Sequence, residues 1–308
     1  MKFLVFILFL ASCSDNTSSA QQLTRKYFDS RDSTRGFYTV IEPKSGKPEI
    51  LLVLLDGFGG NAEAFLTETP IDEKAYENNI LTVCIPTGKR LYPDPTILQL
   101  ITTTLKEVTT RYKITDDKIA MGGFSIGGTI VLRYAELSKE DPASYPFSPK
   151  AVFTGDSPID LADLYRSSKR ELEKNFPGPW LDEAKMIVDS LGHQFGDPDA
   201  NKEAWQKINP FNTADTGTGN EQYIMDIAYR TYHDIDVQWQ MENRGRSIYQ
   251  SNALDGSELI SRLRLRGNKK AAFIQSKIPG MRSNGQRHPH SWNIIDAAEL
   301  IQWIRVSL

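Results

Sequence analysis

The chain of 308 residues has the composition of an ordinary globular protein, with 40% hydrophobic and 24% charged residues. Its formal net charge of −3 gives no electrostatic basis for binding nucleic acid. The length suffices for one large α/β domain or for two small ones. The chain has two cysteines, so no disulfide framework is expected. Cys84 lies within an apolar run and is interpreted as a small buried hydrophobe.

The N-terminus has the features of an export signal, a lysine followed by an apolar run from Phe3 to Ala11. This run is far shorter than the roughly 20 residues of a membrane-spanning helix. Its end, Leu10-Ala11-Ser12-Cys13, resembles the lipobox of bacterial lipoproteins. The resemblance implies a signal peptide over residues 1–12, acylation of Cys13 and a lipidated tether over residues 13–34. The protein would then be anchored to a membrane of the bacterial cell envelope. An ordinary signal peptide cleaved after Ala20 is the alternative, and it would give a secreted or periplasmic protein.

Downstream of the tether, apolar runs of strand length alternate with longer helical patterns. We predict strands at residues 50–55, 80–85, 118–121, 151–154, 227–232 and 271–274, with 36–41 as a candidate first strand. We predict helices at residues 96–112, 126–137, 253–265 and 294–304. Most of the strands are continuous apolar runs, which favours parallel strands covered on both faces. The alternation predicts crossover units and a mostly parallel sheet in one domain over residues 35–308.

Residues 160–222 interrupt this alternation. They contain Phe176-Pro177-Gly178-Pro179-Trp180 and a helical pattern over residues 181–191. We interpret the segment as a helical cap inserted into the α/β domain.

The segment Gly123-Phe124-Ser125-Ile126-Gly127 fits the pattern G-x-S-x-G. Glycine makes up about 7% of residues, so a random chain of this length contains such a match about one time in ten. The context is more specific, because a predicted strand precedes the segment and a predicted helix follows it. A sharp turn between the two would hold Ser125 in a strained conformation with its hydroxyl exposed. A glycine-rich helix start with Ser125 as N-cap is the alternative.

Because Ser125 lies in a G-x-S-x-G segment between a predicted strand and a predicted helix, the chain from about residue 50 to its end resembles the α/β-hydrolase superfamily, in particular bacterial serine esterases. The resemblance implies a doubly wound, mostly parallel sheet, and the chain order nucleophile, acid, histidine. It makes Ser125 the nucleophile.

The segment Asp56-Gly57-Phe58-Gly59-Gly60 is similar to the family's oxyanion loop, with Asp56 where histidine is common. The match implies that the main-chain N–H groups of Phe58 and Ile126 bind the oxyanion. A glycine-rich turn that only closes a strand is the alternative.

The chain has four histidines. His290-Ser291-Trp292 is similar to the family's segment around the catalytic base, and this similarity assigns the base to His290. His288 is then a neighbour of the base or faces the substrate, and no role is predicted for His193 or His233. Two histidines two positions apart without a cysteine or paired carboxylates are a poor zinc pattern, so no metal is expected.

The acid is expected in the loop that follows the strand at residues 227–232. Asp234 and Asp236 are both within reach, and we favour Asp236 because it precedes a helix start. Asp156, after the preceding strand, is a third candidate, since a carboxylate on a neighbouring strand can reach the same histidine. Each of the three is also a candidate for a helix N-cap or a surface carboxylate.

These assignments predict a serine hydrolase that cleaves carboxylic esters through an acyl-enzyme on Ser125 and needs no cofactor. Small-molecule esters or acylated glycans and lipids are the expected substrates. A serine peptidase on the same fold is one alternative. A catalytically inactive binding protein is the other.

Overall fold

The computed structural model describes residues 21–29, 31, 36–215 and 219–308. The predicted signal peptide and Cys13 lie outside the described residues. Among the residues that are described, no helix combines the length and the apolar character needed to cross a bilayer.

The core of the protein is a sheet of eight strands in the order β1-β2-β4-β3-β5-β6-β7-β8. The strands are β1 (Leu23–Tyr27), β2 (Phe37–Ile41), β3 (Ile50–Leu55), β4 (Ile80–Ile85), β5 (Ile119–Phe124), β6 (Ala151–Gly155), β7 (Ala228–His233) and β8 (Ala272–Gln275). Strands β3 to β8 are parallel, whereas β1 and β2 run antiparallel at one edge. The prediction of a mostly parallel sheet is confirmed.

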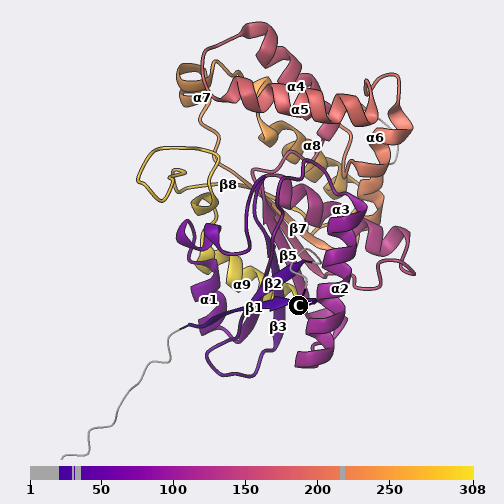
Figure 1. Cartoon of the computed structure of the whole chain (residues 1–308), viewed down its shortest axis with the longest axis vertical. Helices are drawn as coiled ribbons and strands as arrows, with labels where there is room; N and C mark the ends of the chain where they lie inside the picture. The colour runs from indigo at the N-terminus through magenta and orange to yellow at the C-terminus, as the bar shows by residue number, and fades with distance from the viewer. Residues whose placement is uncertain (1–20, 30, 32–35, 216–218) are drawn as a thin grey trace, which may run out of the picture.

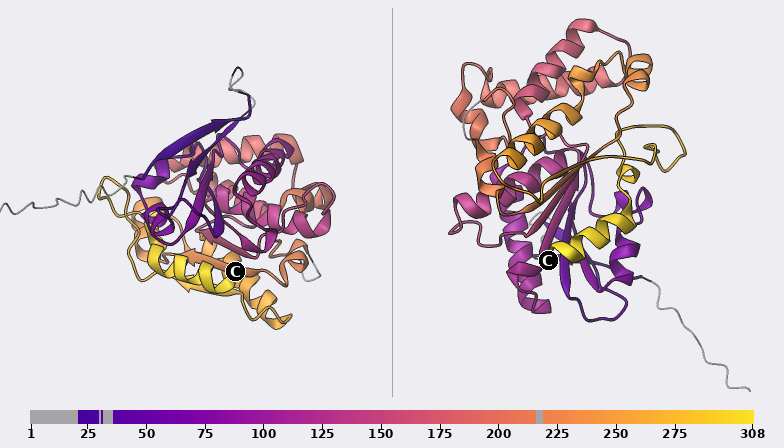
Figure 2. Two further views of the ribbon diagram at one scale, coloured as in Figure 1. Left: turned by 90° about the horizontal axis from the view of Figure 1, so that it is seen from below. Right: turned by 180° about the vertical axis from the view of Figure 1, so that it is seen from behind.

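Helices cover both faces of this sheet, as Figures 1 and 2 show. They are α1 (Ile71–Glu77), α2 (Pro95–Tyr112), α3 (Ile126–Glu140), α4 (Leu161–Lys174), α5 (Trp180–Phe195), α6 (Lys202–Ile208), α7 (Val237–Arg244), α8 (Asn252–Leu265) and α9 (Ala297–Ser307). One apolar cluster joins α2, α3 and α8 to the sheet, and a second joins α1 and α9 to the opposite face. Because both faces are buried, every residue of β3, β4 and β5 is buried, which explains their continuous apolar sequences. Cys84 is buried in the second cluster, as expected.

Several element bounds differ from the sequence-based expectation. Residues 23–27, placed in the tether, form β1, whose Leu23 pairs with Ile41 of β2. Strand β5 continues to Phe124 instead of ending at Met121. A Cβ at Gly122 would lie 2.0 Å from the ring of Phe153. The glycine therefore lets the strand continue beside a bulky neighbour.

Between β6 and β7 the chain forms α4, α5 and α6, which lie above the sheet in Figure 1. Asp160, the N-cap of α4, accepts hydrogen bonds from the main-chain N–H groups of Ala162 and Asp163, both at 3.0 Å. Its second oxygen accepts one from the N–H of Thr213 at 2.8 Å. Asp160, at the start of the segment, is thus hydrogen-bonded to Thr213, near its end.

Candidate active site

Ser125 lies at the turn between β5 and α3 with φ 53° and ψ −132°. A positive φ is uncommon for a residue with a side chain and costs energy that the surroundings must offset. The main-chain N–H of Ser125 donates to Gly155 O at 2.9 Å, which ties the turn to the end of β6. The predicted strand–turn–helix context of Ser125 is therefore present, with the serine in a strained conformation.

The glycines around Ser125 are required by close packing. A Cβ at Gly123 would lie 2.3 Å from the main-chain carbon of Gly127, and a Cβ at Gly127 would lie 2.3 Å from Asp56 O. Contacts this short with backbone atoms do not occur between real atoms. Glycine thus allows the first turn of α3 to approach the loop that follows β3.

That loop, Asp56-Gly57-Phe58, passes directly beside the serine. A Cβ at Gly57 would lie 3.2 Å from Ser125 Cβ and 3.8 Å from its Oγ. Within the described part of the chain, the N–H groups of Phe58 and Ile126 donate to no protein acceptor. Two main-chain donors near Ser125 are thus available for a ligand.

The carboxylate that contacts His290 belongs to Asp156. His290 Nδ1 lies 2.6 Å from Asp156 Oδ2, and Asp156 follows β6 directly. Asp156 has φ 40°, a left-handed conformation that Asp tolerates better than most residues. Burial acts to raise the pKa of Asp156, but hydrogen bonds from His233 and His290 hold it well below its usual range. Asp156 is therefore an ionised acceptor.

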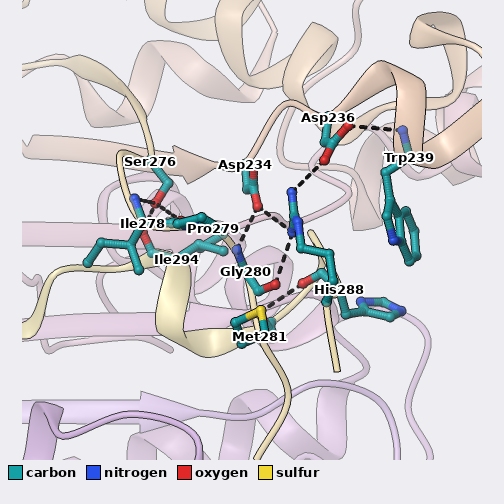
Figure 3. A network of polar contacts seen from close by, with 12 residues as sticks. Asp234, Asp236, Trp239, Ser276, Ile278, Pro279, Gly280, Met281, His288 and Ile294 are labelled. Atoms are coloured by element: carbon teal, nitrogen blue, oxygen red, sulfur yellow. Dashed lines mark hydrogen bonds and ion pairs between the residues drawn. The ribbon is translucent and has the colours of Figure 1, made fainter. Parts of the chain in front are cut away.

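The preference for Asp236 as the acid is wrong. One oxygen of Asp236 caps α7 by accepting from Trp239 N at 2.9 Å, and the other accepts from Arg287 at 2.8 Å. Asp234 accepts from Gly280 N at 2.7 Å and pairs with Arg287 at 2.7 Å. Figure 3 shows both aspartates directed at the loop that carries Gly280 and His288. They fix the segment leading to His290 instead of contacting its imidazole.

His233, for which the sequence predicted no role, lies at the end of β7 and is only 1% exposed. Its Nδ1 lies 3.1 Å from Asp156 Oδ1, and its Nε2 lies 2.7 Å from the hydroxyl of Thr231. Each carboxylate oxygen of Asp156 is thus within hydrogen-bond distance of one histidine. The only signal in the sequence was the position of His233 directly before Asp234, one of the candidate acids.

Asp56 connects the loop after β3 to the histidine segment. Its Oδ1 accepts from Gly57 N at 2.8 Å and from Trp292 Nε1 at 2.7 Å. Burial raises the pKa of Asp56, while these two hydrogen bonds act against that effect. The unusual aspartate therefore links the two parts of the sequence expected to flank the serine.

Two cavities meet at Ser125, and both are lined by Phe58, Ser125, Glu183 and His290. We call one the inner cavity; it extends beneath the cap past Asp156, Leu164, Ile187, Gln240 and Arg244. We call the other the outer groove; it runs past Phe65, Glu68, Met186, Arg282 and Trp292. A ligand with a group on each side of a reacting carbon could occupy both. Among the described residues, no group of three metal-ligating side chains is present.

Comparison with known proteins shows the fold. No family model matches the chain. No curated protein matches it in sequence. Among solved structures, a truncated carbohydrate esterase from gut microbiota is 14% identical with a TM-score of 0.61, covering 94% of this chain and 98% of its own. An esterase of the fungus Rhizomucor miehei is 13% identical with a TM-score of 0.56, covering 93% and 84%. A fluorophosphonate-binding serine hydrolase of Staphylococcus aureus is 12% identical with a TM-score of 0.52, covering 92% and 98%.

The chain has the α/β-hydrolase fold. The fold-class prediction is thus confirmed, and the sheet order and the helices on both faces agree with it. Structural similarity at 12 to 14% sequence identity shows the fold and not the function. Evidence for the function must therefore come from the site.

Proposed function

We propose that the protein is a serine hydrolase that cleaves carboxylic esters, with Ser125 as nucleophile and His290 as base. The observation that carries the proposal is the pair His290–Asp156 at 2.6 Å, beside a strained serine that lines the same cavity. The names of the similar structures, which include a carbohydrate esterase and a ferulic acid esterase, support esters as the substrate class.

The pair with Asp156 determines what His290 can do. When Nδ1–H donates to the carboxylate, the other ring nitrogen, Nε2, carries a lone pair. Nε2 would take the proton of Ser125 Oγ as the oxygen attacks the ester carbonyl, and would then give it to the leaving alcohol. Water activated by the same nitrogen would release the acyl group and regenerate the serine. The ionised Asp156 would stabilise the imidazolium formed in each half-reaction.

The donors for the oxyanion are the N–H groups of Phe58 and Ile126. Neither N–H has a protein acceptor among the described residues, and Gly57 lies close to Ser125; both observations support this assignment. Removing one such donor typically costs about 10²- to 10³-fold in rate. Both donors belong to the main chain, so Asp56 in place of histidine leaves them intact.

The direct test is Ser125→Ala assayed with para-nitrophenyl acetate, with folding checked by circular dichroism. We expect hydrolysis to fall to background while the fold is kept. A fluorophosphonate probe should label the wild-type chain and not Ser125→Ala. A folded Ser125→Ala variant with full activity would refute the proposal. Absence of labelling and of hydrolysis in the wild type would favour an inactive binding protein, and cleavage of amides in preference to esters would favour a peptidase.

We also propose that the enzyme acts at the bacterial cell envelope, tethered by acyl chains on Cys13. The sequence Leu10-Ala11-Ser12-Cys13 supports this proposal. Each buried methylene adds about 0.8 kcal/mol of membrane affinity, so more than one acyl chain gives stable anchoring. Palmitate labelling of the wild type but not of Cys13→Ser, with processing blocked by globomycin, would support the tether. Release of a soluble chain beginning after Ala20 would contradict it.

A further inference from the structure

Arg244, the last residue of α7, places an unpaired positive charge in the inner cavity. Within the described part of the chain, its guanidinium makes no ion pair, and its one hydrogen bond goes to His288 Nε2 at 2.8 Å. The other arginine of this cavity, Arg246, pairs with Glu171, and Arg282 in the outer groove pairs with Glu68 at 3.4 Å. In the part of the chain that the structure describes, Arg244 thus lacks the carboxylate partner that Arg246 and Arg282 have.

His288 is a neutral hydrogen-bond acceptor for Arg244. The Nδ1–H of His288 donates to the main-chain oxygen of His290 at 2.9 Å, which leaves Nε2 to accept from Arg244. Burial and the charge of Arg244 lower the pKa of His288 to about 3, so it carries no charge at neutral pH. The rings of His288 and Trp239 lie 5.2 Å apart and side by side in Figure 3, and Arg244 lies 5.9 Å from the Trp239 ring. These contacts orient the guanidinium without neutralising it.

Most acidic side chains of the inner cavity, Asp156 and Asp160 included, have partners other than Arg244. Glu171 accepts from Arg246 at 2.8 Å, Asp163 lies 3.7 Å from Arg170, and Asp234 is bound to Arg287. Burial raises the pKa of Asp255 to about 8, so it is mostly protonated at neutral pH. Glu183, at the rim, is exposed to solvent, which screens its charge.

Two further polar atoms in the same cavity have no partner in the described part of the chain. Gln240 Oε1 and Gln250 Nε2 are both buried, and both residues line the inner cavity with Arg244. A buried polar atom without a hydrogen bond costs free energy, typically about 1–3 kcal/mol, unless a ligand or water satisfies it. Polar groups of a ligand bound to Arg244 would therefore lie near two glutamines with unsatisfied atoms.

From these contacts we propose that the ester substrate carries a carboxylate that binds Arg244. This inference rests on the proposed hydrolase function and narrows its substrate class to acidic esters. The guanidinium is planar, and among the described residues most of its N–H donors have no acceptor. It can therefore bind a carboxylate in the bidentate geometry that arginine favours. Because Ser125 lines the inner cavity, either part of the ester could extend from the serine into it. The carboxylate could therefore belong to the acyl group or to the alcohol.

The test compares matched ester pairs with the full chain. For an acyl-side charge, the pair is para-nitrophenyl hydrogen succinate and para-nitrophenyl methyl succinate. For an alcohol-side charge, it is para-acetoxybenzoate and its methyl ester. The readout is the ratio of kcat/KM, anionic over neutral ester, after subtraction of spontaneous hydrolysis. We expect a ratio of at least about 10 in one pair, since a hydrogen bond to a charged group contributes roughly that much.

Variants then assign the selectivity to Arg244. Arg244→Gln should reduce the ratio to about 1, and Arg244→Lys should keep part of it because the charge remains. The matched control is Arg264→Gln at an exposed position of α8, which should leave the ratio unchanged. A wild-type ratio of 1 or less in both pairs would overturn the inference whatever the variants do. So would a high ratio that survives in Arg244→Gln. In either case Ser125→Ala still tests the hydrolase function separately.

Discussion

Asp156 Oδ2 accepts a hydrogen bond from His290 Nδ1 at 2.6 Å, although 134 positions separate the two residues. The other oxygen of the same carboxylate faces His233 Nδ1 at 3.1 Å. A carboxylate with a donor on each oxygen has little freedom to rotate, so its orientation toward His290 is fixed before any substrate arrives.

Exchange of each candidate acid for its amide should identify the carboxylate that serves His290. Asp156→Asn should lower kcat/KM by about 10³- to 10⁴-fold, because an amide can favour the wrong histidine tautomer and cannot stabilise the imidazolium. Asp236→Asn should cost less than about tenfold, since Asn also caps helices and the pair with Arg287 is partly exposed. Steady-state kinetics on para-nitrophenyl acetate decides between them. The reverse order of effects would restore Asp236 as the acid.

His233 should act as a positioning residue for Asp156. In His233→Leu the carboxylate loses the donor to Oδ1, and we expect kcat to fall by about 10- to 100-fold, the value of one hydrogen bond to a charged group. His233→Asn places an amide N–H near the former Nδ1 and should recover a large part of this loss. Melting temperatures measured in parallel show whether activity follows stability alone. If the Leu and Asn variants are equally active at equal stability, His233 has no positioning role.

Gly127→Ala should damage the turn at Ser125. The added methyl would lie 2.3 Å from Asp56 O, so either α3 or the loop after β3 must shift. We expect a loss of stability of about 1–3 kcal/mol and a fall in activity, because the same loop carries Phe58. Urea unfolding and ester hydrolysis measure the two effects. The control is Gly192→Ala in α5, where the methyl would meet only the edge of Tyr165 at 3.2 Å and alanine favours the helix.

The free energy of unfolding should decrease as the pH rises, because Asp255 is held protonated in the folded chain. Its pKa is raised to about 8 by burial and by the charge of Asp160, so the folded chain keeps a proton that the unfolded chain loses above about pH 4. The contribution of this group is therefore fully present below about pH 4 and is lost as the pH rises to about 8. In that window each pH unit costs up to about 1.4 kcal/mol.

The measurement is the free energy of unfolding at pH 5 and pH 8 for the wild type and Asp255→Asn. The variant has no proton to lose, so its loss of stability over this range should be smaller. Asp189→Asn, at an exposed pair with Lys185, serves as the control and should follow the wild type. Equal losses in all three chains would show that Asp255 is ionised in the folded state.

The sequence alone determined the features that depend on local patterns. Strands β3 and β4 were predicted with their observed bounds, because strands buried on both faces read as continuous apolar runs. The turn at Ser125 could be located because the required glycines are close together in the chain. His290 was assigned through a local motif, and the structure places it beside Ser125 and Asp156 in one cavity.

Only the tertiary structure decided which carboxylate meets His290 and which charge is left unpaired. In the parallel sheet, Gly155 of β6 is paired with Tyr232 of β7. The residues that follow the two strands therefore lie side by side, and more than one carboxylate is close enough to be a candidate partner of His290. Arg287 binds Asp234 and Asp236, which leaves Asp156 to the imidazole. Arg244 donates to the neutral His288, and no carboxylate in the described part of the chain pairs with it. These outcomes depend on contacts between residues far apart in the chain, and no local pattern contains them.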